Sequence, residues 1–199
     1  MGRLLNELLV LARADAGHEQ LTRERLYLDE LVNDVLGAMA PLAEARQVRL
    51  AGEVAGPLLV EGDQTRLTQL IVNLVENAIK YTAAGGQVSV TVERQASRAV
   101  IRVADTGIGI PAEHLPHVFE RFYRVDTSRS RSEGGEGLGL AICWWVAQAH
   151  GGSIQVHSTP GKGSTFTVFL PASLQESQQA RRPNAPPRPA LSEQTAAAR

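Results

Sequence analysis

The chain has 199 residues, 43% hydrophobic and 21% charged, which is enough apolar content for one globular domain with a core plus additional segments. A formal net charge of -1 provides no basic field for nucleic acid, and the single cysteine, Cys143, excludes an internal disulfide framework and suits a reducing compartment. No apolar run reaches the roughly 18 residues that cross a membrane, so we expect a cytoplasmic chain without a membrane segment.

Residues 1–16 predict an amphipathic helix, because leucines recur on one side of it and Gly17 can cap its carboxyl end. A leucine stripe ahead of a globular part needs a partner. Three partners are open at this point: the following domain, a second copy of the chain, or a preceding segment of a longer chain.

The next elements alternate between strands and helices. Asp29 is the expected N-cap of the first helix, and Asp63 is the expected N-cap of the second. In chain order, the apolar patterns predict a strand at 26–28, a helix at 29–45, strands at 48–54 and 58–60, and a helix from 64 to about 82.

The helix after Asp63 carries an unusual polar face. Its apolar stripe comprises Leu67, Leu70, Ile71, Leu74, Val75, Ala78 and Ile79. Asn73, Asn77 and Tyr81 repeat every four residues on another side, with Lys80 beside them. Asparagine is a poor helix former, because its amide competes for nearby backbone groups. The row is therefore either a solvated face or a set of amides and an ammonium directed at a ligand.

The second half of the chain predicts two hairpins separated by a loop and a helix. In order, we expect strands at 88–92 and 99–103, a short helix at 111–115, a polar mobile loop at 124–136, a helix at 137–150, and strands at 153–157 and 165–170. From about residue 172 the chain has almost no large apolar residue and is expected to be disordered. Hairpins with intervening helices predict an α+β two-layer sandwich: a mixed, mostly antiparallel sheet with helices on one face.

Two further segments carry groups that suit a ligand, as the asparagine row does. Asp105-Thr-Gly107-Ile-Gly109 ends a strand, so its carboxylate can accept from an exocyclic amine while the glycines allow close approach of a planar ligand. Gly135-Glu-Gly137-Leu-Gly139 opens a helix, whose free N–H groups favour phosphate. Side-chain amide oxygens such as those of Asn73 and Asn77 are ligands that Mg²⁺ accepts, and Lys80 can meet a phosphate.

These residues resemble the catalytic ATP-binding domain of sensor histidine kinases, in the superfamily shared with DNA gyrase and the heat-shock chaperone ATPase. Asn73–Thr82 resembles the family's N box, Asp105–Ile110 the G1 box, Phe119–Arg124 the F box, and Gly135–Leu140 the G2 box. The order and separations of the four motifs also fit, over about residues 22–171.

The resemblance implies a fold of the Bergerat type, ATP and Mg²⁺ as cofactors, and roles for individual residues. Asn77 would bind Mg²⁺, Asp105 the adenine amine, and Asn73, Asn77 and Lys80 would carry the catalytic step. The implied nucleotide-binding set is Asn73, Asn77, Lys80, Tyr81, Asp105, Gly107, Ile108, Gly109, Phe122, Tyr123, Arg129, Gly135, Gly137, Leu138, Gly139 and Thr165. Residues 124–135 would form the ATP lid, with Arg129 or Arg131 as the phosphate contact and Phe119 and Phe122 packing at its base.

The resemblance also implies partners. Residues 1–21 look like the end of the second helix of a dimerisation hairpin plus a linker, 22–171 like the catalytic domain, and 172–199 remain the tail. None of the five histidines stands in the family's phosphoacceptor context, so we expect the accepting histidine on a hairpin outside this chain. A response regulator would take the phosphoryl group, and the full-length kinase would be a homodimer, with the inner membrane as one location for a full-length form.

Two other functions stay open on the sequence. The chain could be a non-catalytic ATP-binding module that contacts a partner, or a serine kinase of an anti-sigma-type relative. The leucine-rich residues 4–12 favour the histidine kinase, because they resemble part of a dimerisation hairpin. Asn73 stands where related hydrolases carry a glutamate base, and an amide suits transfer to an imidazole better than hydrolysis.

Overall fold

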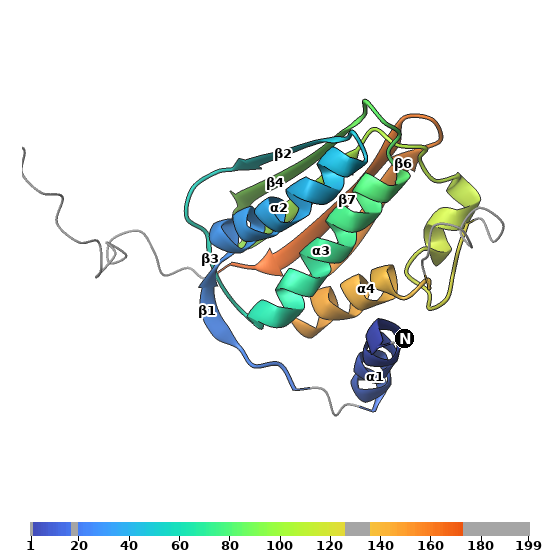
Figure 1. Ribbon diagram of the computed structural model, residues 1–199. Coiled ribbons are helices and arrows are strands. Elements are labelled where there is room, and N and C mark those ends of the chain that lie inside the picture. The colour runs from blue at the N-terminus through green and yellow to red at the C-terminus, as the bar shows by residue number, and fades with distance from the viewer. Residues whose placement is uncertain (1, 17–19, 126–135, 173–199) are drawn as a thin grey trace, which may run out of the picture.

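Five strands form a mixed sheet in the computed structural model, which describes residues 2–16, 20–125 and 136–172 (Figure 1). Across the sheet the strands are β2 (Arg49–Val54), β4 (Gln87–Gln95), β5 (Arg98–Asp105), β7 (Gly163–Pro171) and β6 (Ser153–Thr159). Only β2 and β4 run parallel, and each other neighbouring pair of this sheet is antiparallel. The predicted α+β fold with a mostly antiparallel sheet is confirmed.

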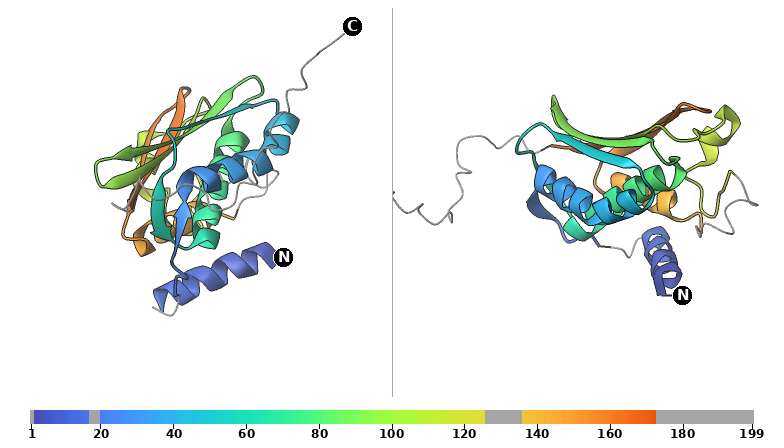
Figure 2. Two further views of the ribbon diagram at one scale, coloured as in Figure 1. Left: turned by 90° about the vertical axis from the view of Figure 1, so that its left-hand side faces the viewer. Right: turned by 45° about the horizontal axis from the view of Figure 1, so that its top comes forward.

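Three helices cover one face of the sheet: α2 (Leu28–Ala45), α3 (Gln64–Tyr81) and α4 (Gly139–Ala149) (Figures 1 and 2). The short helix expected near residue 111 is a 3-10 helix, η1 (Ala112–His117). The helices lie in one layer and the strands in the other, so the predicted two-layer arrangement is confirmed.

Helix α3 is the centre of the core. All seven residues of its predicted apolar stripe are buried, and a fully buried leucine or isoleucine contributes about 1.5–3 kcal/mol to folding. The Asp63 side chain accepts a hydrogen bond from the Arg66 backbone N–H at 3.0 Å, which confirms the predicted N-cap. The helix is therefore held by its apolar side, and its polar side is available for other contacts.

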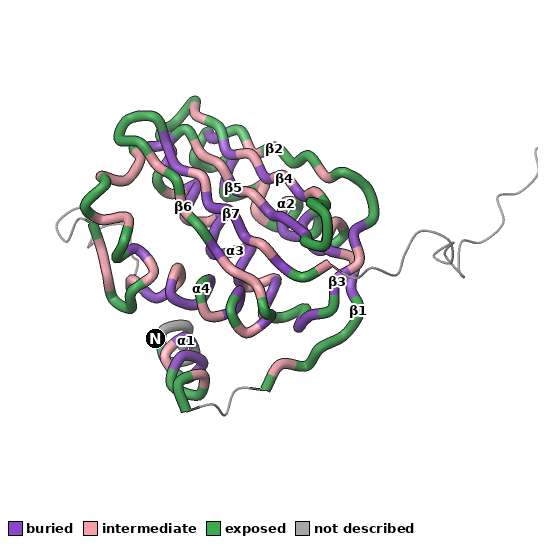
Figure 3. The backbone as a smooth tube through the Cα atoms, turned by 180° about the vertical axis from the view of Figure 1, so that it is seen from behind, coloured by how far each residue is buried: buried purple, intermediate pink, exposed green. Residues whose placement is uncertain are grey.

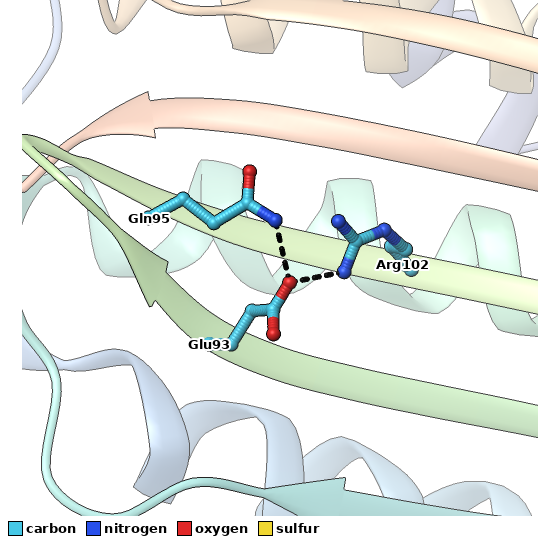
Figure 4. A network of polar contacts seen from close by, with 3 residues as sticks. All are labelled: Glu93, Gln95 and Arg102. Atoms are coloured by element: carbon cyan, nitrogen blue, oxygen red, sulfur yellow. Dashed lines mark hydrogen bonds and ion pairs between the residues drawn. The ribbon is translucent and has the colours of Figure 1, made fainter.

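The strands alternate between the core and the far side of the sheet. On β4, Val88, Val90 and Val92 face the helices, and the sheet seen from behind shows this alternation of burial (Figure 3). On β4 and β5, Glu93 accepts hydrogen bonds from Gln95 and Arg102 (Figure 4). This polar network runs from the hairpin turn at Gln95 to the middle of β5 at Arg102.

Two short strands form a separate small sheet. β1 (Glu24–Tyr27) pairs antiparallel with β3 (Leu59–Gly62). The prediction that Asp29 caps α2 is wrong: Tyr27 is the N-cap residue, and no side-chain cap bond is made. The Asp29 carboxylate instead accepts from the Leu58 backbone N–H at 2.9 Å and so joins α2 to the segment before β3.

The N-terminal helix α1 (Gly2–Asp15) lies beside α4, below the helical layer in Figure 1. Leu11 is buried in the core cluster, and the Arg121 guanidinium pairs with both carboxylate oxygens of Asp15. Leu5 and Leu9 on the same helix are 62% and 41% exposed. No helix in the described residues is long and apolar enough to cross a membrane, and the predicted disordered tail lies outside those residues apart from Ala172.

Candidate nucleotide-binding site

The polar face of α3 runs between two segments that are distant in sequence. At its middle, the Asn73 side-chain N–H donates to the Gly139 carbonyl at 3.2 Å, at the start of α4. At its carboxyl end, the Tyr81 carbonyl accepts from the Ile108 backbone N–H at 3.2 Å. The half-buried Asn77 and Lys80 lie between these contacts along the helix. The fold thus brings the three predicted motifs to one face of α3.

Asp105 ends β5 with one carboxylate oxygen already bonded. Its Oδ1 accepts from the backbone N–H of Gly107 at 2.8 Å and of Ser164 at 3.2 Å. Burial raises the pKa of this carboxyl above its ordinary value, while both backbone bonds oppose the rise. Among the described residues, Oδ2 has no recorded hydrogen bond, so this oxygen is the one available to accept from an amine of a ligand.

The glycines after Asp105 allow the loop to lie against the rest of the fold. A side chain at Gly107 would put its Cβ 2.4 Å from the Tyr81 carbonyl oxygen. Gly109 has φ +69°, a conformation that favours glycine, and a Cβ there would lie 2.1 Å from the Thr159 carbonyl oxygen. The neighbouring Ile108 side chain is exposed and can contact a base.

Thr165, also in the predicted nucleotide-binding set, lies on β7 next to this loop. It pairs with Ala104 on β5 and with His157 on β6, and its side chain is half-buried. It is therefore close in the sheet to Asp105, although sequence places the two residues sixty positions apart.

The two ends of the predicted lid meet at its base. The Phe122 backbone N–H donates to the Gly137 carbonyl at 2.9 Å, and the Tyr123 hydroxyl lies 2.7 Å from His114 Nδ1. Phe119 packs edge-on against Phe166, as expected for a packing residue, but the Phe122 side chain is 57% exposed. The expectation that Phe122 anchors the lid by side-chain packing is therefore wrong, and its backbone makes the anchor.

The start of α4 offers its N–H groups without competition from a side-chain cap. Leu138 is the N-cap residue and makes no side-chain cap bond. Its side chain is buried in the core, so only its backbone can meet a ligand. Free N–H groups and the helix dipole favour phosphate at this position.

Sequence reasoning missed Arg124 as a candidate. Its Nη2 is buried and has no hydrogen-bond partner among the described residues, and it stands at the base of the lid. A buried guanidinium nitrogen without a partner is costly unless an anion completes it. Its place at the end of the predicted F-box motif was the available signal. The predicted contacts Arg129 and Gly135 lie outside the described residues.

The chemistry of Asn77 suits an Mg²⁺ ion that is bound together with a nucleotide. The described residues contain no group of three or more histidine, cysteine, aspartate or glutamate side chains that could hold a metal. Mg²⁺ commonly takes one or two protein oxygens and completes its shell with phosphate and water. The half-buried amide of Asn77 can supply one such oxygen.

Comparisons with known proteins agree with this geometry. Residues 62–174 match the family described as histidine kinase-, DNA gyrase B- and HSP90-like ATPases. The sensor histidine kinase RppB of Synechocystis is 41% identical over 172 residues, which cover 86% of this chain and 38% of RppB. The sensor-like histidine kinase SenX3 of Mycobacterium tuberculosis is 38% identical over 191 residues, covering 96% of this chain and 47% of SenX3. The chain thus spans less than half the length of these relatives.

Solved structures give the same result. Full-length ShkA in complex with AMPPNP superposes with a TM-score of 0.77 at 31% identity, covering 86% of this chain and 35% of ShkA. The mycobacterial sensor histidine kinase MprB superposes with a TM-score of 0.67 at 28% identity, covering 76% of this chain and 98% of that chain.

Proposed function

The chain belongs to the family of histidine kinase-, DNA gyrase B- and HSP90-like ATPases, and we propose that it is the catalytic, ATP- and Mg²⁺-binding part of a two-component sensor histidine kinase. One observation carries the proposal: the polar face of α3 lies between the Asp105 loop and the start of α4. Residues 73 to 81 span about 12 Å of helix, so a single elongated ligand can reach both ends.

Each end of this face suits a different part of ATP. Oδ2 of Asp105 accepts from the adenine amine, and the N–H groups at the start of α4 bind phosphate oxygens. Lys80 supplies positive charge between the two ends of the α3 face, and Arg124 supplies positive charge at the base of the lid. The amide oxygen of Asn77 would coordinate Mg²⁺, and the ion would supply positive charge to the phosphates when bound with the nucleotide.

The chemistry of the site suits transfer to a histidine. A neutral imidazole nitrogen attacks the γ-phosphorus, the bond to the bridging oxygen breaks, and ADP leaves. No strong base is required, and the buried Asn73, whose amide is bonded to α4, supplies none. The protein's contribution is therefore positioning and charge stabilisation.

The accepting histidine is proposed to lie on a dimerisation hairpin, with a response regulator as the next acceptor. The similarity to named sensor kinases supports this, as does α1, whose exposed Leu5 and Leu9 are suited to a second helix. A homodimer follows for the full-length kinase if that hairpin is complete.

The test uses Asn77→Ala, with Asn33→Ala on the exposed face of α2 as a matched control. Calorimetry with a non-hydrolysable ATP analogue and Mg²⁺ measures binding, and transfer is followed from labelled ATP to a separate histidine-bearing hairpin. We expect Asn77→Ala to lose Mg²⁺-dependent binding and transfer, while the control behaves as the native chain.

The label identifies the function. Acid-labile, base-stable label on the hairpin supports the kinase, whereas tight ATP binding without transfer to any of several hairpins supports a non-catalytic module. Acid-stable label on a protein partner would favour a serine kinase. Unchanged binding and transfer in Asn77→Ala would refute the assignment of the site.

A further inference from the structure

The Ser158 hydroxyl joins three segments near Asp105. It donates to the Gly163 carbonyl at 2.8 Å, accepts from the Ile110 backbone N–H at 2.8 Å, and lies 3.0 Å from the Ser164 hydroxyl. A hydroxyl has one donor and two acceptor positions, so these contacts use its full capacity, with Ser164 donating. Ser158 is on β6, outside all four motifs of the sequence analysis.

One of these bonds controls the peptide unit that holds Asp105. The carbonyl of Gly163 and the N–H of Ser164 belong to the same planar peptide. Ser158 holds that carbonyl, and the N–H on the opposite side donates to Asp105 Oδ1 at 3.2 Å. Together with the β6–β7 pairing of these residues, the Ser158 hydroxyl therefore helps to fix the orientation of the donor that positions the Asp105 carboxylate.

The second bond fixes the far end of the same loop. The loop from Asp105 to Ile110 begins at the carboxylate and ends at the Ile110 backbone N–H, which donates a hydrogen bond to the Ser158 hydroxyl. Between these points, the Ile108 carbonyl accepts from the Gly161 N–H at 2.8 Å. The β6–β7 turn thus forms a backing for the loop. Ser158 contacts the Ile110 end of the loop directly and the Asp105 end through the Gly163–Ser164 peptide.

We propose that Ser158 is a positioning residue for nucleobase recognition: its hydroxyl aligns Asp105 Oδ2 with the exocyclic amine and so favours ATP over GTP. This rests on the proposed ATP-binding function. Adenine presents an amine at the position where guanine presents a carbonyl oxygen, so a fixed acceptor binds the first and repels the second. A freely moving carboxylate discriminates less.

The test measures binding of non-hydrolysable ATP and GTP analogues with Mg²⁺ by calorimetry. Ser158→Ala removes the hydroxyl, Ser158→Thr keeps it, and Ser153→Ala removes a hydroxyl at the other end of β6. We expect Ser158→Ala to weaken ATP-analogue binding about tenfold, the effect of about one net hydrogen bond, with much less change for the GTP analogue. Ser158→Thr and Ser153→Ala should both keep the ratio of ATP-analogue to GTP-analogue affinity that the native chain has.

The outcomes separate this inference from the proposed function. An unchanged ATP-to-GTP affinity ratio in Ser158→Ala overturns the inference. If both affinities fall equally, the substitution has loosened the site in general; if neither falls, the hydroxyl has no role in binding. Asp105→Asn serves as the reference: if it loses the preference and Ser158→Ala keeps it, the site stands and the inference fails. If the native chain binds neither analogue, the proposed function fails, and the inference with it.

Discussion

His150 joins the carboxyl end of α4 to the start of α3, and its protonation should weaken the fold. The residue is 4% exposed. Its Nδ1 lies 2.7 Å from the Val146 carbonyl, and its Nε2 accepts from the Asp63 backbone N–H at 2.9 Å. The two partners require the neutral tautomer with hydrogen on Nδ1, because a proton on Nε2 would face the N–H of Asp63.

The environment shifts this equilibrium in one direction. Burial lowers the pKa of His150 below its ordinary 6.5; Arg23 adds to the lowering, while the bond to Val146 and the charge of Asp63 oppose it. The unfolded chain therefore binds more protons than the folded chain once the pH falls below about 6.5. The stabilisation is complete above that pH and is lost as the pH falls toward the folded pKa, by at most about 1.4 kcal/mol per pH unit for one proton.

Urea unfolding of the native chain and of His150→Gln between pH 8 and pH 5 measures this effect. At pH 8 we expect the variant to be less stable by about 1–3 kcal/mol, because the buried N–H of Asp63 loses its acceptor. At pH 5 the difference should shrink. The unvaried chain loses stability there because its unfolded state binds a proton at His150, whereas His150→Gln has no such group. His157→Gln, at an exposed histidine on β6, controls for the loss of a histidine elsewhere. A difference that is constant or larger at pH 5 would refute the reasoning.

Three further substitutions test other contacts. Gly109→Ala should destabilise the fold by about 1–2 kcal/mol for its positive φ and abolish nucleotide binding in calorimetry, because its Cβ would lie 2.1 Å from the Thr159 carbonyl oxygen. Asp63→Ala should lower the free energy of unfolding in urea by about 1–2 kcal/mol through loss of the α3 cap. Arg121→Ala, which breaks the exposed pair with Asp15, should leave the thermal midpoint unchanged but speed proteolytic cleavage after α1.

The elements that sequence analysis predicted well are those whose burial is encoded locally. The α3 stripe repeats at helical spacing, and the β4–β5 hairpin alternates with period two, so each pattern states which side meets the core without knowledge of the partner. The four motifs of the site were found by their resemblance to a known family, which short and contiguous segments allow. The meeting of three of them at α3 follows from the order of the strands, which no single segment contains.

The wrong predictions concern one side chain whose partner is distant in sequence and one whose direction is set by its backbone conformation. Asp29 is a residue type that commonly caps helices, yet its carboxylate accepts from the Leu58 backbone N–H. The segment at Leu58 approaches α2 closely enough to offer that N–H. Phe122 is a large apolar residue of the kind that usually packs in a core. Its backbone has a positive φ of 62°, and its side chain is exposed. Local sequence propensity cannot show whether a side chain bonds within its own helix or to a backbone group of another element, because the position of that element is not encoded locally.

The glycines of the site show the same limit most clearly. As sequence, Gly161-Lys162-Gly163 is a simple hairpin turn, and nothing in it indicates a ligand. In the fold, a Cβ at Gly163 would lie 1.9 Å from the Asp105 carbonyl oxygen, so the turn can back the nucleotide loop only without a side chain there. The same close approach brings the Ser164 N–H to the Asp105 carboxylate. The Asp105 carboxylate, which we propose recognises the base, therefore depends on a turn about sixty residues away, and the proposed site extends beyond the motifs by which it was found.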